Sequence, residues 1–232
     1  MRKMSNNKRT VIIAFTLIIM ISVSFFLGCN SNYSSKKTGY FKIALPQHQY
    51  QLFNDSNFPY RFEYPVYANI IQDSSYFDSK PENDYWINVD FPEFDARIFL
   101  SYKIIGGKTT FKIKQTDGIY KDSIGINYFD KMVNDAFNLT NKNDVIATSI
   151  NDSLILTPNH ITGVFFKVAG NAATAKQFFL SDTTHHFIRG ALYFNTTPNA
   201  DSLKPVQDHL QKDIEHLINT FSWKNTTKKN HD

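Results

Sequence analysis

Short runs in which apolar and polar residues alternate fill most of the chain after residue 40. Alternation with a period of two is typical of strands that bury one face. Pro46 and Pro65 are expected to close the first two runs, because proline ends most strands. The predicted strands are FKIAL (41–45), RFEY (61–64), WINVDF (86–91), DARIFLSYKI (95–104), DVIATSI (144–150), TGVFFKVAG (162–170), KQFFLSD (176–182) and HFIRGALYFN (186–195). The third and fourth are expected to form a hairpin around the tripeptide PEF.

Two stretches change from this period to a helical one. The apolar face of the first, over 126–137, consists of Ile126, Phe129, Val133 and Phe137, with Met132 and Ala136 beside them. The second, over residues 201–221, has a longer apolar stripe made of Leu203, Val206, Leu210, Ile214, Leu217, Ile218 and Phe221. Asp201 or Ser202 is expected to cap this helix, and Pro205 is expected in its first turn, where the missing N–H does least harm.

Consecutive strands with hairpin-length connections and two amphipathic helices predict an α+β protein. We expect a single globular domain over residues 40–224, with a mostly antiparallel β-sheet, packed helices and a long C-terminal amphipathic helix. A mature chain of about 200 residues suits one domain. Residues 225–232, NTTKKNHD, are expected to form a disordered polar tail.

The N-terminus has the pattern of a secretory signal. A basic stretch is followed by the uncharged, apolar residues 11–28, and Cys29, the one cysteine of the chain, comes next in FFLGCN. This is where a lipoprotein signal peptide is cut and the cysteine acylated, for example with palmitate. The match is partial, since Phe26 stands where Leu is usual and Leu27 where a small residue is usual. We predict a signal peptide over 1–28 and lipidation of Cys29.

An uncleaved transmembrane helix is the alternative, although eighteen apolar residues barely span a bilayer. The basic residues would hold the N-terminus inside in both cases, so the domain would lie on the same side of the membrane. Residues 29–39 are expected to be the lipidated N-terminus and a flexible tether. No acidic run follows Cys29. In Bacteroidetes-type bacteria such a run sends lipoproteins to the cell surface, so its absence favours a domain that faces the periplasm.

The formal net charge of +4 comes from the predicted signal peptide. Of the 25 basic residues, four lie in the first ten positions, which leaves 21 against 21 acidic residues. A neutral mature chain has no general attraction for phosphates, and no basic stripe with interleaved aromatic residues occurs. We therefore expect no nucleic-acid partner.

Motifs for catalysis are missing from the sequence. There is no G-x-S-x-G, and GGKT at 106–109 lacks the upstream glycine of a phosphate loop, so it is interpreted as a turn. Five acidic residues cluster in sequence without a spacing that would place two carboxylates around a substrate, namely Glu63, Asp84, Asp90, Glu93 and Asp95. The sequence favours a protein that is not an enzyme, with no catalytic residue and no cofactor.

The histidines do not have the spacing of a metal site. His185 and His186 are adjacent, so on a strand they would point to opposite faces. His209 and His216 are seven residues apart, about 10 Å along a helix, which exceeds the reach of one zinc ion. Asp213 follows His209 by four residues, and we interpret the two as a pair on a solvated helix face. No metal site is expected.

Two further sets of residues are candidates for binding or modification. Ser123, Ser153 and Thr183 each follow an aspartate in a pattern that accepts O-glycans in periplasmic proteins of Bacteroidetes-type bacteria; Ser202 has the same context, but helix capping explains it first. On the strand at 186–195, the polar set alternates with an apolar set, namely Ile188, Leu192 and Phe194. If the apolar set is core, a partner can bind the opposite face, through Arg189, Tyr193 and Asn195; an ordinary solvated face is the alternative.

Several blocks resemble the GldD family of gliding-motility lipoproteins, in matching order over residues 39–224. They include GYFKIALPQHQYQLF, FPYRFEYPVYANI, WINVDFPEFDARIFLSYK and, most specifically, the segment from Arg189 to Val206, whereas 105–160 matches more loosely. The resemblance implies a cell-envelope lipoprotein of the gliding machinery that works with the type IX secretion system and with other gliding lipoproteins, a GldJ-like one foremost. It offers no catalytic residues. The order of the elements is also similar to the Mog1/PsbP-like fold.

Two functions of different classes follow from these expectations. The first is a non-catalytic assembly or stabilising factor, which binds a partner lipoprotein or the secretion apparatus while the lipid holds it in place. The second is a periplasmic enzyme or small-ligand carrier that uses a pocket in the sheet. An exposed apolar patch over a filled core would favour the first, and a cavity with convergent polar groups would favour the second.

Overall fold

The computed structural model describes residues 7, 15–17, 43–72 and 81–224. By its contacts the chain divides into two units, residues 1–41 and 42–232, and the fold below is that of the second unit. The predicted lipidation site Cys29, the tether and the C-terminal tail lie outside the described residues. Among the residues described, no helix is long and apolar enough to cross a membrane.

A seven-stranded antiparallel sheet is the centre of the domain. Its strand order is β3-β4-β5-β11-β10-β9-β8, and every neighbouring pair is antiparallel. The strands are β3 (Asn69–Gln72), β4 (Ile87–Phe91), β5 (Ala96–Ile104), β8 (Ala147–Leu156), β9 (Thr162–Gly170), β10 (Lys176–Ser181) and β11 (His186–Phe194). The predicted hairpin around PEF is confirmed, because β4 and β5 pair across a short 3-10 helix, η1 (Pro92–Phe94).

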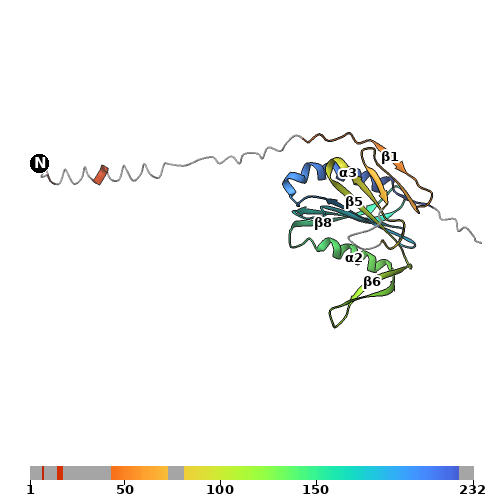
Figure 1. The fold of residues 1–232 in the computed structure, drawn as a ribbon. Coiled ribbons are helices and arrows are strands. Elements are labelled where there is room, and N and C mark those ends of the chain that lie inside the picture. Colours follow the sequence, from red (N-terminus) through yellow and green to blue (C-terminus); the bar gives the residue numbers. More distant parts are fainter. Residues whose placement is uncertain (1–6, 8–14, 18–42, 73–80, 225–232) are drawn as a thin grey trace, which may run out of the picture. The chain divides into compact units, whose positions relative to one another are not determined.

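Two smaller sheets and two α-helices complete the domain. A three-stranded sheet consists of β1 (Tyr50–Phe53), β2 (Tyr60–Pro65) and β12 (Ser222–Trp223), and a separate hairpin consists of β6 (Lys108–Lys114) and β7 (Tyr120–Ile126). Helix α3 (Ala200–Thr220) and β1 lie on one face of the large sheet, and α2 (Phe129–Asn141) lies on the other (Figure 1). The predicted α+β class, with a mostly antiparallel sheet and a long C-terminal helix, is therefore confirmed.

The core on the α3 face is large and aromatic, because the three-stranded sheet adds a second layer there. The ring of Phe221 lies 5.7 Å from that of Tyr60 and 4.7 Å from that of Trp223. The buried α3 residues of this core are Val206, Leu210, Ile214, Leu217 and Ile218, as the sequence pattern predicts. The packing is tight: a Cβ added at Gly190 would lie 2.3 Å from the ring of Phe178 on the paired strand.

The core on the α2 face is smaller. Its buried residues are Met132, Ala136, Val164, Phe166, Phe179 and Phe187. Helix α2 covers β9, β10 and the start of β11, while Phe129, Val133 and Phe137 pack at the edge of this cluster. One short helix therefore closes only part of this face.

Several predicted elements differ from the structure. Residues 43–49 form no strand, and β1 begins at Tyr50. Tyr50 pairs with Pro65, the last residue of β2, so the residues before Tyr50 have no β2 residue to pair with. The expected strand at 144–150 is displaced, since β8 begins at Ala147. The hairpin of β6 and β7 was not predicted, and it includes Ile126, which we had assigned to the first helix.

The start of α3 also differs from the expectation. Asn199, and not Asp201 or Ser202, is the N-cap, because its side-chain oxygen accepts a hydrogen bond from the backbone N–H of Ser202 at 3.2 Å. The helix therefore begins one residue earlier than predicted. Pro205 consequently lies in the second turn instead of the first, where its missing N–H leaves the carbonyl of Asp201 without the usual i+4 donor.

Candidate functional site

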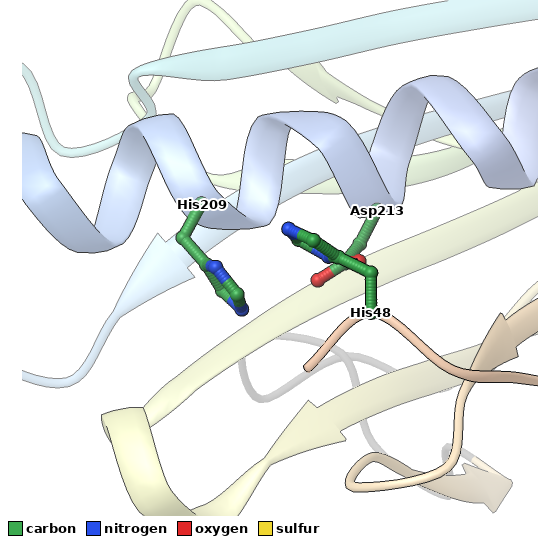
Figure 2. A group of neighbouring side chains, drawn as sticks. All are labelled: His48, His209 and Asp213. Carbon is green, nitrogen blue, oxygen red and sulfur yellow. The ribbon is translucent and has the colours of Figure 1, made fainter. Parts of the chain in front are cut away.

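Two histidines and an aspartate meet where the chain leading into β1 crosses α3 (Figure 2). His209 and Asp213 project from successive turns of α3, and His48 reaches them from the extended segment before β1. One potential ligand atom from each of the three side chains lies within 4.8 Å of the others. The prediction of a solvated His209–Asp213 pair is wrong: the two residues are only 7% and 1% exposed, because residues of the β1 segment cover this part of the helix.

Asp213 is the centre of the cluster. One carboxylate oxygen contacts Nδ1 of His48 at 2.7 Å and accepts a hydrogen bond from the hydroxyl of Tyr50 at 3.1 Å. The other oxygen accepts a short hydrogen bond from the hydroxyl of Tyr67, in the turn between β2 and β3. A buried carboxylate needs such donors, because burial without a partner is strongly unfavourable. The segment leading into β1 and the turn between β2 and β3 thus converge on one side chain of α3.

Tyr67 and His209 extend the network. The Tyr67 hydroxyl also lies 2.9 Å from Nε2 of His209, and the rings of His209 and His48 are stacked with centroids 4.2 Å apart. Burial is the main cause that lowers the pKa of His209, and the nearby His48 lowers it further. Burial and the adjacent Asp213 raise the pKa of Tyr67 and raise that of Tyr50 to about 12. Both phenols therefore keep their protons at neutral pH and act as donors to the carboxylate.

A second set of contacts joins α3 to β1 and β2, one turn further along the helix. The ring of His216 is stacked on that of Tyr50, with centroids 3.5 Å apart, and its Nε2 lies 2.7 Å from a carboxylate oxygen of Glu63 on β2. The polar residues of α3 that face β1 are thus occupied by contacts with β1 and β2. This interface consists of hydrogen bonds and ring stacking, and no serine or cysteine takes part in these contacts among the residues that the structure describes.

The arrangement suits binding of a cation better than covalent catalysis. Two imidazoles and a carboxylate are typical ligands of zinc-class metal ions. The sequence contains one part of the signal, the His209–Asp213 spacing of four residues. It could not reveal His48, which lies more than 160 residues away and reaches α3 only through the tertiary fold.

The proposed partner face is less open than a solvated sheet face. Arg189 and Tyr193 lie on the side of β11 opposite to the α3 core, as expected from the alternation, but both are half-buried. Arg189 donates a short hydrogen bond to the buried Gln177, and the ring of Tyr193 contacts that of Phe99 edge-on. Asn195, just beyond β11, is exposed. Tyr193 and Asn195 line a hollow of about 490 Å³ between the end of β4 and the start of β5.

The remaining predicted positions lie apart from the histidine cluster. Ser153 on β8 and Thr183 in the β10–β11 turn are exposed, and Ser123 on β7 is partly exposed. His185 is exposed, whereas His186 begins β11 and its Nδ1 lies 2.6 Å from the hydroxyl of Tyr102. The structure does not bring these residues together.

These features define a class of protein: an antiparallel α+β domain with a polar histidine–carboxylate cluster and no evident nucleophile beside it. The family follows from sequence comparison. The family model described as gliding motility lipoprotein GldD matches residues 30–223, so the chain belongs to the GldD family. It is accordingly a membrane-anchored lipoprotein of the cell envelope with a role in gliding motility.

Two other comparisons add little. A search of curated proteins found no match. Among solved structures, the chain is similar to cyanobacterial PsbP (CyanoP) from Synechocystis sp. PCC 6803, with a TM-score of 0.39 and 11% identity over 79% of this chain and 98% of that one. Because this TM-score is low, the α+β class is assigned from the sheet topology described above and not from this similarity.

Proposed function

We propose that this protein is a non-catalytic assembly or stabilising factor of the gliding machinery. A lipid on Cys29 would hold it in the cell envelope with the domain facing the periplasm. Its family supports the setting. The observation that carries the binding role is the hairpin of β6 and β7, called the arm below, which is not part of the large sheet and exposes apolar side chains on both strands.

The arm projects from the domain beyond α2 (Figure 1). Ile119, Tyr120 and Ile124 are 66%, 61% and 74% exposed. Exposed apolar surface of this kind marks protein interaction sites, and an isolated two-stranded hairpin is only marginally stable in water. A partner that covers the arm would bury these side chains and complete the hairpin's packing.

The base of the arm is held firmly, so the exposed residues are presented in a defined position. Glu82 accepts hydrogen bonds from Lys103, Thr109 and the side-chain amide of Asn127, at 2.6, 2.9 and 2.7 Å. The ammonium of Lys131 on α2 lies 4.9 Å from the centre of the Phe111 ring, a cation–π distance. The arm is thus an anchored projection of the domain.

The partners that we propose are other gliding lipoproteins, a GldJ-like lipoprotein first, and components of the type IX secretion system. A protein and partner anchored to one membrane meet at high effective concentration, so a modest interface suffices. The lipid anchor and the arm would act together: the anchor restricts the search, and the arm supplies the contact.

Site-specific crosslinking in intact cells tests this proposal. A photoreactive residue at position 124 should capture a gliding lipoprotein or a secretion component, whereas one at Glu215, exposed on α3, should not. Position 195 tests the surface of Arg189, Tyr193 and Asn195. Capture from 195 or 215 but not from 124 would contradict the arm as the contact. A deletion strain that glides and secretes normally would contradict the function itself.

A second candidate function has one observation in its favour. The hollow beside Tyr193 and Asn195 has a volume within the range of small-ligand sites, and Asp90 and Arg97 line it with a 2.7 Å ion pair. A periplasmic carrier or enzyme would use such a hollow. Native mass spectrometry of the full chain purified from cells distinguishes the two, since a carrier retains a small molecule and an assembly factor does not.

The intact mass of the mature chain tests the proposed modifications. Acylation of Cys29 predicts loss of residues 1–28 and addition of lipid, and Cys29→Ala should abolish the lipid mass. O-glycans on Ser123, Ser153 or Thr183 would add further mass, which the corresponding alanine variants would remove. A mass equal to polypeptide plus lipid would exclude the glycans.

A further inference from the structure

We infer that His48, His209 and Asp213 bind one divalent metal ion of the zinc class, which fastens the segment before β1 to helix α3. The inference is independent of the partner proposed above. It depends on three observations: the burial of Asp213, the convergence of three suitable ligand atoms, and the absence of a lysine or arginine from the contacts of Asp213 in the described part of the chain.

Asp213 poses a charge problem that a cation would solve. Its side chain is 1% exposed, and the charged-group partner that the structure gives it is His48, a neutral ring unless protonated. Buried carboxylates in proteins are generally paired with a cation or bound to a metal. Tyr50 and Tyr67 supply hydrogen bonds but no positive charge. A metal ion at this position would supply that charge.

The geometry is close to that of a zinc site. His209 and Asp213 are four residues apart on one helix face, the spacing at which two ligands of a helix reach one ion. A tetrahedral zinc ion with ligand distances of about 2.1 Å needs ligand atoms about 3.4 Å apart. The three atoms here lie within 4.8 Å of one another, so the widest pair must close by at most about 1.4 Å. Nδ1 of His48 and the carboxylate oxygen of Asp213 are 2.7 Å apart, so as ligands of one ion they must separate by about 0.7 Å. Rotation of the partly exposed His48 side chain can provide this separation.

The surroundings resemble the outer shell of a metal site. The Tyr50 hydroxyl holds the carboxylate from the side of β1, and outer hydrogen bonds of this kind orient metal ligands. The Tyr67 hydroxyl donates to the other carboxylate oxygen of Asp213 and adds a second hydrogen bond of this kind. Two imidazoles with one carboxylate favour zinc over calcium or magnesium, which prefer oxygen ligands.

A metal ion here would have a mechanical consequence. His48 lies in the described segment that continues from the predicted tether, and Asp213 lies at the centre of α3. Coordination would tie the membrane-proximal end of the domain to its longest helix. Pulling through the lipid anchor would then act on α3 through a metal–ligand bond as well as through hydrogen bonds.

Zinc titration of the full chain tests the inference. The protein is purified in detergent, stripped with EDTA and titrated with zinc chloride by calorimetry, and its thermal unfolding is followed with and without zinc. We expect one zinc ion per chain and a higher Tm with zinc. Cobalt should replace zinc and show the visible absorption of a four-coordinate site, whereas magnesium should not bind.

Three variants make the test specific. Asp213→Asn keeps the shape of the side chain, and His48→Ala changes a partly exposed residue outside the core while Asp213 keeps its hydrogen bonds from Tyr50 and Tyr67. Each should weaken zinc binding at least about 10- to 100-fold, the loss typical of damage even to the outer shell. His185→Ala, which removes an exposed histidine far from the cluster in sequence, should bind zinc as the wild type does.

Several results would overturn the inference. They are the absence of saturable binding by the wild type, equal affinity in the wild type and His48→Ala, and loss of binding in His185→Ala, which would assign the zinc to surface histidines. Far-UV circular dichroism without zinc shows whether Asp213→Asn is folded. If it is not, the comparison of His48→Ala with His185→Ala decides.

Discussion

The two faces of the seven-stranded sheet are covered to different extents, with a large core on one face and a small core on the other. The α3 face carries a second sheet and a large aromatic core, and even its polar residues are joined in the cluster around Asp213. The α2 face carries one short helix over a small core, with the arm beyond it. The larger core of the α3 face is therefore expected to contribute more to stability than the core of the α2 face, and the proposed binding role of the arm belongs to the α2 side.

Strand β10 allows a direct test of this comparison, because two neighbouring phenylalanines point to opposite faces. Phe178 is buried in the α3 core and Phe179 in the α2 core. Phe178→Ala should lower the free energy of unfolding by about 4–5 kcal/mol and Phe179→Ala by about 3 kcal/mol, since a cavity in the tighter core relaxes less. Chemical denaturation of both variants measures the difference.

The two alanine variants control for each other, because they change the same residue type on the same strand. Equal losses would mean that the two cores are equally rigid. A larger loss for Phe179→Ala would reverse the assignment of stability to the α3 face.

A smaller loss of stability is expected at acidic pH, and it comes from His186 at the edge of the α3 face. Burial lowers the pKa of His186 below its usual value of 6.5, and Asp182 only partly offsets this. The unfolded chain therefore binds a proton at a higher pH than the folded chain does. Stability should fall as the pH drops below about 6.5 and should level off below the folded-state pKa.

His186→Gln should reduce this loss of stability, since glutamine does not titrate and can still accept a hydrogen bond from Tyr102. His185→Gln, at the exposed neighbouring position, should keep most of the wild-type dependence, because burial is the main cause of the lowered pKa of His186 and the charge of His185 is a smaller one. Thermal unfolding between pH 5 and 8 measures the slopes, a range in which histidine is the side chain expected to titrate. An unchanged slope in His186→Gln would mean that other groups dominate.

The smallest effect on stability is expected from the arm. Ile124→Ser changes a side chain that is 74% exposed, so the free energy of unfolding should change by no more than about 0.5 kcal/mol. Gliding and partner capture should nevertheless decrease if the arm is the contact. A stability loss comparable to that of Phe179→Ala would instead mean that the arm supports the domain.

The sequence was most informative where period and burial agree. The strands that became β9, β10 and β11 and the stripe of α3 were predicted almost residue by residue, because alternation and helical spacing report directly on which side chains are buried. The arm was not predicted, although Phe111 and Ile113 alternate with polar residues: both faces of the hairpin are largely exposed, so this alternation does not correspond to one buried face. The strand expected at 41–45 was wrong over its described residues, 43–45, because alternation alone does not provide a neighbouring strand to pair with.

By itself the sequence determined the antiparallel α+β class, the long C-terminal helix and the membership of a lipoprotein family, since all three depend on local patterns of residues. Only the tertiary structure decided that His209 and Asp213 are buried and that His48 and Tyr67 join them. The physical reason is that burial of a polar pair depends on what packs over it. Here that cover comes from residues more than 140 positions away, and no local spacing encodes them.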